Sequence, residues 1–460
     1  MLLLTSPSLG LQVCWFLLTS SGTPYLISLG IPKFMISLVW ITGPMFGAFV
    51  QPVLGALSDQ SQHPWGKRKP FIIYGSAAAT ISLLVLANSS ELTSWMWYSS
   101  LESSDNSDHW QTQILAAVLV IIVTLALTAY AVGVRALIVD NSPPAQQSAA
   151  ASWAMRWNVL GNVLLSAVGF VDTQWSLFAD EGNARFKILA IVVAACTAST
   201  VGLSCCSISN ERNSVAREHQ PGFMQLCRSV ISPIGLAKQW WQLSPRSRQV
   251  CEIQFYAWAG WFPVLYYMST FVLETALSNE LEHRHREMRQ PDPALIEDAG
   301  SYSFFASFAF ALGAFFSSVV LQTFDCAKPA LTRNPSQLWL ASQCFLGYCM
   351  HLTLVARSGA MAIVVVALMG VTAAVTMWAP YAIISSEISE LSASKPHSDV
   401  AWILGLHNMA ISLPQIGSTL VCALLLAALK SLQVENSMAW VFRLASVPVF
   451  WSAYLIYKLH

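Results

Sequence analysis

FMISLVWITGPMFGAFVQPVLGAL, residues 34–57, runs directly into the charged loop SDQSQHPWGKRKP, residues 58–70. The first part contains no Asp, Glu, Lys or Arg. Its 24 residues, at about 1.5 Å of helical rise each, are enough to cross the roughly 30 Å hydrocarbon core of a bilayer. The loop then carries Asp59 and a run of three cations at 67–69. Short loops rich in Lys and Arg stay in the cytoplasm, so this stretch predicts a membrane helix that ends inside the cell.

The composition is that of a membrane protein. Of the 460 residues, 55% are hydrophobic and 10% are charged, and the mean hydropathy is +0.53. A water-soluble protein of this size would need a more polar surface, so we expect a polytopic membrane protein. The formal net charge is zero, which gives no basis for a nucleic-acid partner. Nine of the ten cysteines lie in apolar runs or at their ends, so no disulfide framework is expected.

Uncharged runs predict an all-α integral membrane fold with twelve transmembrane helices. A basic cytoplasmic linker, residues 208–248, separates them into an N-terminal six-helix bundle at 1–207 and a C-terminal six-helix bundle at 249–460. The outer loop 89–111 contains no Lys or Arg, so both termini are expected in the cytoplasm. The predicted spans are 9–29, 34–57, 71–88, 113–139, 150–171, 186–207, 249–271, 299–324, 337–356, 360–385, 400–429 and 439–457.

Short segments around the first loop carry a resemblance to a known family. TPY, LGIP, WITGP, VQP, LGALSD and GKRKPFI resemble the first two helices of the sucrose transporter family, fungal type, a branch of the glycoside-pentoside-hexuronide:cation symporters in the major facilitator superfamily. Gly55, Asp59, Gly66 and Arg68 resemble the superfamily's loop signature, which implies a gate that latches the cytoplasmic side. A charged loop that only sets topology is the alternative. We expect the charges of this loop to be solvated, and to affect turnover more than folding.

An arginine within the fourth span is the first candidate for a substrate contact, because ionisable side chains at membrane depth mark substrate or ion pathways by default. Arg135 lies five residues before Asp140, at the inner end of that span. Thr124 and Thr128 fall on the same helical stripe, since eleven residues at about 100° each leave only about 20° after three full turns. The stripe predicts a polar track, and ordinary helix–helix packing is the alternative explanation for the threonines.

The segment RALIVD, residues 135–140, resembles the fourth-helix motif of the family, in which the arginine binds the sugar. The family has an aspartate, taken as the proton acceptor, at the position of Thr124. A threonine does not exchange protons at physiological pH, so the resemblance in this helix does not imply proton coupling. Leu18 and Asp298 are two further departures from the family's polar positions.

Three later segments resemble the family closely. They are SWAMRWNVLGNVL from residue 152, VTMWAPYAIISSEI from residue 375 and LGLHNMAISLPQIGSTL from residue 404. Their tryptophans offer flat faces to a sugar ring, and anchoring at the membrane interface is the alternative use of such residues. For His407 the alternative is a core histidine held by a helix neighbour. The predicted substrate-binding residues are Arg135, Thr124, Thr128, Trp153, Arg156, Asn158, Trp378, His407 and Asn408.

These observations favour a major facilitator transporter that alternates access to a central site, with a small-molecule solute and the lipid bilayer as partners. The first hypothesis is uptake of a glucoside such as sucrose or maltose. The resemblance implies that uptake is coupled to protons, but Thr124 at the position of the family's acid argues against proton coupling. The second is transport or export of a fungal secondary metabolite, and the third is a sensor that transports nothing. No enzyme fingerprint occurs in a convincing setting, and no cofactor or metal is expected, since His283 and His285 do not share a helix face. We expect a monomer in the plasma membrane.

Overall fold

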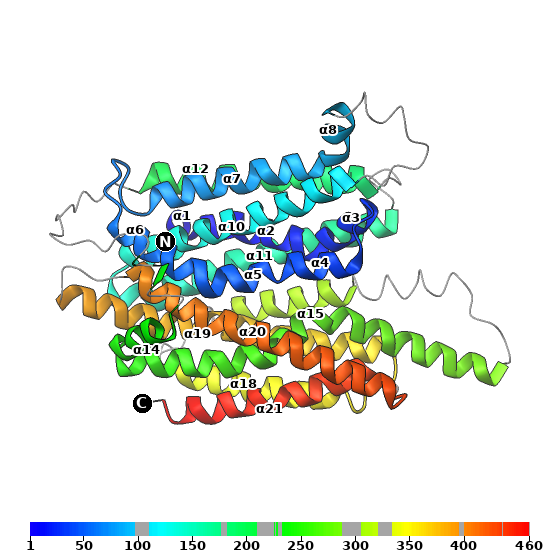
Figure 1. Ribbon diagram of the computed structural model, residues 1–460. Helices are drawn as coiled ribbons and strands as arrows, with labels where there is room; N and C mark the ends of the chain where they lie inside the picture. Colours follow the sequence, from blue (N-terminus) through cyan, green and yellow to red (C-terminus); the bar gives the residue numbers. More distant parts are fainter. Residues whose placement is uncertain are drawn as a thin grey trace. The chain divides into compact units, whose positions relative to one another are not determined.

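Helices form the regular structure of the chain. The computed structural model describes residues 1–96, 110–175, 182–208, 225, 227–228, 232–287, 305–320, 334–394, 400–434 and 436–459, and the regular elements within these ranges are helical. They are drawn in Figure 1 and are α1 (Leu2–Thr5), α2 (Pro7–Leu17), η1 (Leu18–Gly22), α3 (Thr23–Ser28), α4 (Lys33–Trp40), α5 (Thr42–Met45), η2 (Phe46–Val50), α6 (Gln51–Gln60), α7 (Lys69–Ala87), α8 (Ser89–Met96), α10 (Trp110–Asp140), η3 (Pro144–Gln146), α11 (Gln147–Trp175), α12 (Gly182–Ser207), α14 (Pro233–Gln242), α15 (Pro245–Glu287), α18 (Pro335–Leu352), α19 (Gly359–Ser394), α20 (Val400–Ser431) and α21 (Ser437–Tyr457). A further helix covers Phe305–Val320.

Among the described residues, eight helical segments are long and apolar enough to cross a bilayer. Each coincides with a predicted span. Three of the remaining predicted spans coincide with α11, α15 and α18, and the helix Phe305–Val320 lies within the predicted span 299–324, of which residues 299–304 and 321–324 lie outside the described residues. These helices are shorter or less apolar than the eight segments. The all-helical, membrane-spanning class predicted from hydropathy is therefore confirmed. The eight segments are Leu2–Gly22, Leu38–Gln60, Lys69–Ala87, Trp110–Asp140, Phe186–Ser207, Gly359–Leu391, Val400–Ser431 and Ser437–Tyr457.

The second predicted span changes its helical register midway. It passes from α5 through the π-helical turn η2 into α6, and we refer to residues 42–60 as helix 2. The N–H of Gln51 donates to the carbonyl of Phe46, five residues back instead of four. Pro52 follows; it has no N–H, and in a regular helix its ring crowds the carbonyl four residues earlier, so the wider turn accommodates it. Such π-turns inside α-helices are frequent at functional sites.

Proximity of Cα atoms divides the chain into two compact units. α11 groups with the later helices, and the first ten residues of α20 group with the earlier ones. This grouping follows packing instead of chain order, so the two six-helix bundles expected at 1–207 and 249–460 stay a prediction. The first unit contains Met1–Pro143, Ser176–Gln242 and Lys395–Met409, and the second contains Pro144–Trp175, Leu243–Ser394 and Ala410–His460.

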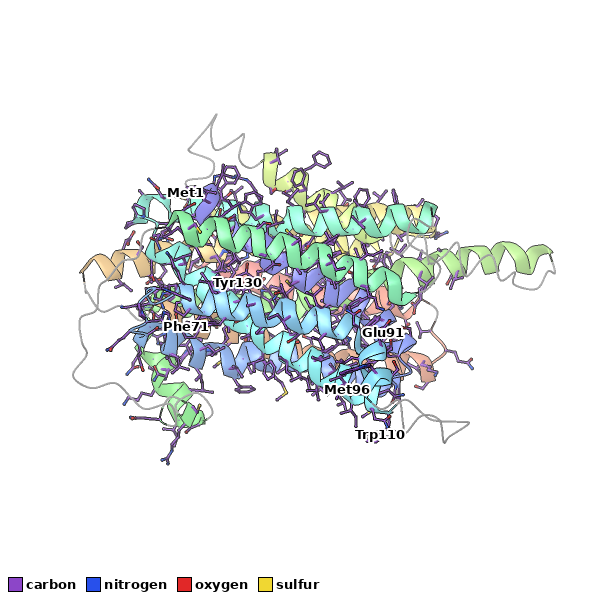
Figure 2. All side chains as sticks on the ribbon, turned by 90° about the horizontal axis from the view of Figure 1, so that it is seen from above. Met1, Phe71, Glu91, Met96, Trp110 and Tyr130 are labelled. Carbon is purple, nitrogen blue, oxygen red and sulfur yellow. The ribbon has the colours of Figure 1, made fainter. Side chains whose placement is uncertain are left out.

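In the first unit, α10 packs against α7, and α12 packs against α2 and α7. Figure 2 shows Phe71, near the start of α7, and Trp110, at the start of α10, at opposite ends of this unit, so the two helices run antiparallel. Tyr130 is fully buried midway along α10 and donates its hydroxyl to the carbonyl of Pro7 in α2, at 2.7 Å. This packing sets the depth and rotation of α10, the helix that carries Arg135.

In the second unit, α15 and α18 pack against α21, while α19 packs against α11, α15 and α18 (Figure 1). Trp261, Trp339 and Phe442 are fully buried among these helices. Lipid tails are as apolar as such side chains, so close packing holds the helices together more than exclusion of water does. The arrangement brings α11 beside α19, and with them the predicted residues Trp153 and Trp378.

Candidate substrate-binding site and inner latch

Arg135 makes the central contact of the predicted site. It is half-buried on α10, and its Nη1 donates to Oδ1 of Asn408 on α20 at 2.8 Å. Asn408 is buried, and its Nδ2 donates to the carbonyl of Gly47 at 3.3 Å, in the π-turn of helix 2. His407, the next residue on α20, is fully buried and lies within electrostatic reach of Arg135. The amide of Asn408 thus links three helices of the first unit: α10, helix 2 and its own helix α20.

The two threonines of the predicted track are buried on α10. The hydroxyl of Thr124 donates to the carbonyl of Val120 at 2.8 Å, and that of Thr128 donates to the carbonyl of Thr124, also at 2.8 Å. A hydroxyl has one proton to donate and two lone pairs. Each oxygen can therefore act toward a ligand as an acceptor, and neither can take up a proton as a carboxylate does.

The other predicted residues lie in the second unit. The guanidinium of Arg156 sits 4.6 Å from the centre of the Trp153 ring, and its Nη2 donates to the hydroxyl of Ser152 at 2.9 Å. Trp378 is buried on α19, and its indole N–H donates to the carbonyl of Ser148 at 3.0 Å. Asn158 is half-buried two residues after Arg156. A fixed cation and aromatic faces are suited to a polar ligand with apolar C–H surfaces.

The inner loop signature forms a buried ion network centred on Arg68. Its Nη2 lies 2.7 Å from Oδ1 of Asp59, its Nε donates to Oδ2 of Asp140 at 2.6 Å, and its Nη1 donates to the hydroxyl of Ser58 at 2.9 Å. The side chains of Arg68 and Asp59 are only 6% and 4% exposed. Burial alone would lower the pKa of Arg68, but the charges of Asp59 and Asp140 outweigh it and raise that pKa. The expectation that these charges are solvated is wrong, because helices α6, α10 and α20 close over them.

Asp59 also caps a helix. Its Oδ1 accepts the backbone N–H of Ala401 at 3.2 Å, and its Oδ2 accepts that of Trp402 at 2.9 Å. These are the first free N–H groups of α20, which begins at Val400. A carboxylate there satisfies unpaired donors and lies at the positive end of the helix dipole. The loop thus holds the inner end of α20 as well as the inner end of α10.

The two glycines of the signature have different physical roles. A Cβ on Gly55 would lie 2.4 Å from the carbonyl oxygen of Ala401, so any side chain there would force helix 2 and α20 apart. Gly66 has φ +91 and open space around it, so it is glycine that permits the left-handed turn of the loop. Its N–H donates to the carbonyl of His63 at 2.9 Å.

Sequence reasoning missed some partners of the predicted residues. The sequence analysis placed Asp140 at the end of the fourth span without a partner in the loop, yet it pairs with Arg68, which lies 72 positions away. Gly405 was not singled out, although a Cβ on it would lie 2.6 Å from the Cα of Pro52. The sequence held one available signal for each: an acid at the end of a predicted span, and a glycine inside an apolar helix, about one turn from the predicted contact Asn408.

Comparison with known proteins bears on the class of the chain. The family model described as MFS/sugar transport protein matches residues 3–280. The general alpha-glucoside permease of Schizosaccharomyces pombe is 26% identical, over 98% of this chain and 91% of its own length. The sucrose transport protein SUC4 of Arabidopsis thaliana is 24% identical, over 90% of this chain and 82% of its own.

Solved structures with the same fold are more distant in sequence. FucP, a Major Facilitator Superfamily transporter crystallised in the outward conformation, aligns with a TM-score of 0.63 at 13% identity, over 99% of this chain and 97% of its own. A bacterial homologue of the iron transporter ferroportin, in an outward-facing state, aligns with a TM-score of 0.63 at 14% identity, over 100% and 98%. At such identities the likeness shows the fold alone, and it confirms the predicted major facilitator architecture.

Proposed function

The chain belongs to the MFS/sugar transport protein family, and from that premise we propose that it carries an α-glucoside such as sucrose or maltose across a membrane by alternating access. Relatives aligned over most of its length are an alpha-glucoside permease and sucrose transport proteins, which supports this substrate class. The plasma membrane as its location, cytoplasmic termini and a monomeric state are parts of the same proposal.

The observation that carries the proposal is the 2.8 Å bond between the half-buried guanidinium of Arg135 and the buried amide of Asn408. A guanidinium presents five N–H donors in a planar fork, which suits the paired hydroxyl oxygens of a sugar. In a half-buried site each such bond is stronger than in water, because the local dielectric is low. His407 stands beside this pair, so the first unit supplies a cation and further polar groups within one small volume.

Residues of the second unit complement these contacts in chemistry. Arg156 stacked on Trp153 offers N–H donors at the edge of an aromatic face, and Trp378 offers a second such face on α19. Sugars combine hydroxyl groups with patches of C–H, so they are recognised by hydrogen bonding and aromatic contact together. We assign Trp153, Arg156, Asn158 and Trp378 to the substrate on this basis.

We also propose that transport is not coupled to protons. Thr124 stands where the family has an acid, and its hydroxyl bonds its own helix backbone. Among the described residues of the first unit, the acids have other partners: Asp59 and Asp140 bind Arg68, and Glu91, beyond the opposite end of α7, bonds Lys187. A uniporter mechanism needs no titrating group at the substrate.

The test is counterflow in proteoliposomes. Vesicles preloaded with unlabelled maltose or sucrose and diluted into trace labelled sugar should show transient, saturable accumulation of label. Asn334→Ala, at the start of α18 and away from every proposed contact, is the control for folding and insertion. Absence of counterflow for α-glucosides, in protein that remains folded, overturns the proposed substrate class and favours export of another organic solute.

A further inference from the structure

The first two turns of α20 lie against helix 2 at successive depths. At the inner end Asp59 accepts the N–H groups of Ala401 and Trp402. One turn deeper on helix 2, Gly55 approaches Ala401 so closely that a Cβ would lie 2.4 Å from its carbonyl oxygen. These contacts are backbone against backbone or carboxylate against backbone, so they hold only while the two helices stay within van der Waals distance.

The contact continues toward the substrate site. A Cβ on Gly405 would lie 2.6 Å from the Cα of Pro52 and 3.2 Å from the carbonyl oxygen of Gln51. Asn408 then donates to the carbonyl of Gly47 at 3.3 Å. On helix 2 the contacting residues recur every four positions, which places them on one face. We name the α20 seam as residues 47, 51, 52, 55 and 59 of helix 2 with residues 401, 402, 405 and 408 of α20.

Each end of the α20 seam is bonded to an arginine on its own unit. Arg68 holds Asp59 at the inner end, at 2.7 Å. Arg135 holds Asn408 at the deep end, at 2.8 Å. Asn408 and Ala401 are two helical turns apart on nearly the same side of α20, since seven residues at about 100° leave about 20°. A shift of α20 at Asn408 therefore also moves its capped start at Ala401, because the helix between them is short and rigid.

We infer that the α20 seam couples sugar binding at Arg135 to release of the inner latch, with Asn408 as the positioning residue between them. A sugar diol that takes the Nη1 edge of Arg135 competes with Oδ1 of Asn408 for the same donors. Asn408 then loses the bond that fixes its amide toward Gly47, and the deep end of the seam loosens. The inference rests on the proposed function, because it requires a ligand with hydroxyl groups at Arg135.

The geometry favours an all-or-none release. The atoms nearest to a Cβ on Gly55 or Gly405 belong to the backbone of the facing helix, which cannot move to fill a gap as a flexible side chain can. Packed contacts of this kind are bistable and do not deform gradually. Loss of contact near residue 405 therefore carries over to residue 401, where the N–H groups leave Asp59. In this way a neutral sugar opens the latch although it bears no charge that acts on Asp59 or Arg68.

Hydrogen–deuterium exchange on the full-length protein in detergent tests the inference, because the N–H groups of Ala401 and Trp402 exchange only when Asp59 releases them. We expect maltose or sucrose to raise exchange in residues 400–409 severalfold in the parent. In Asn408→Ala exchange should already be high without sugar and should not rise further. In Asn408→Asp the new carboxylate pairs with Arg135, so exchange should stay low and sugar should bind several times more weakly.

Thr419→Ala is the matched control, since its hydroxyl bonds the carbonyl of Gln415 on the same helix, and it should keep the parent's response. If sugar binds the parent without raising exchange at 400–409, or if Asn408→Ala keeps the sugar response, the inference is overturned. If the parent binds no sugar, the proposed function fails separately. The sugar-free difference between parent and Asn408→Ala still decides whether Asn408 fastens the seam: equal exchange would refute it.

Discussion

Arg68 and Arg135 are two arginines of one unit, and their partners differ in kind. Arg68 bonds the carboxylates of Asp59 and Asp140, and its side chain is 6% exposed. Arg135 is half-buried and bonds the neutral amide of Asn408. Carboxylates neutralise a guanidinium, whereas an amide orients it without cancelling its charge. The difference favours a structural task for Arg68, whose charge is neutralised by its partners, and it supports our proposal that Arg135 contacts a polar ligand.

The largest expected effect is loss of stability at Arg68. Arg68→Ala leaves Asp59 and Asp140 without their shared cation, and breaking a buried pair in this way costs about 3–5 kcal/mol. Thermal unfolding in detergent should therefore show a large drop in Tm. Lys67→Ala is the control, because Lys67 is exposed beside Arg68 and should leave Tm unchanged. A Tm for Arg68→Ala equal to that of the control would mean that the network contributes nothing to the fold.

An intermediate effect is expected from Thr124→Asp, which places an acid on the stripe of Arg135 and makes its helix resemble the family's. In the parent we expect sugar transport to vary little between about pH 5 and 7.5, the range in which a carboxylate with a raised pKa titrates. The variant should acquire pH dependence in that range. Initial rates of sugar entry into proteoliposomes decide the matter. Strong acid stimulation of the parent, abolished by a protonophore, would show that another group couples protons.

The smallest effect belongs to an exposed ion pair that serves as a baseline for the two arginines. Lys187 donates to Glu91, whose side chain is 56% exposed, and this bond lowers the pKa of the Glu91 carboxyl. The stabilisation from this ion pair is thus fully present above the unfolded-state pKa of Glu91, about 4.3. It is lost as pH falls through the lower folded-state pKa. Glu91→Gln should cost at most about 1 kcal/mol at pH 7 and nothing at pH 2, by Tm. A cost at pH 2 equal to that at pH 7 would exclude the charge as its source.

Local patterns in the sequence were enough to predict the helices and the loop signature. Apolar runs located the spans, because a helix that crosses lipid must be apolar along its length. The charge of the GKRKP loop places it on the cytoplasmic side, and that orientation stays a prediction. The π-turn η2 was not predicted. It depends on how helix 2 packs around Pro52, and no short sequence pattern indicates that packing.

The partners of the site residues were harder to predict, because they depend on which helices pack against one another in the fold. Arg135 and Asn408 were both named, yet they lie 273 positions apart, and nothing local to either indicates the other. Burial of Asp59 and Arg68 was missed for the same reason: a charged loop looks solvated until a helix start is packed onto it. Thr124 and Thr128 lie on the predicted stripe, and their bonds to backbone carbonyls follow from helix geometry alone.

The most direct test of the distinction between the two arginines is equilibrium binding of maltose or sucrose to purified Arg135→Lys and Arg68→Lys, measured side by side by isothermal titration calorimetry. Lysine keeps the charge at each position but lacks the planar fork. Our account predicts that Arg135→Lys loses at least tenfold in sugar affinity, about 1.4 kcal/mol, while Arg68→Lys binds sugar at least as tightly as the parent despite a lower Tm, because a weaker latch does not oppose binding. Equal affinity in Arg135→Lys and the parent, or a comparable loss in both variants, would contradict it.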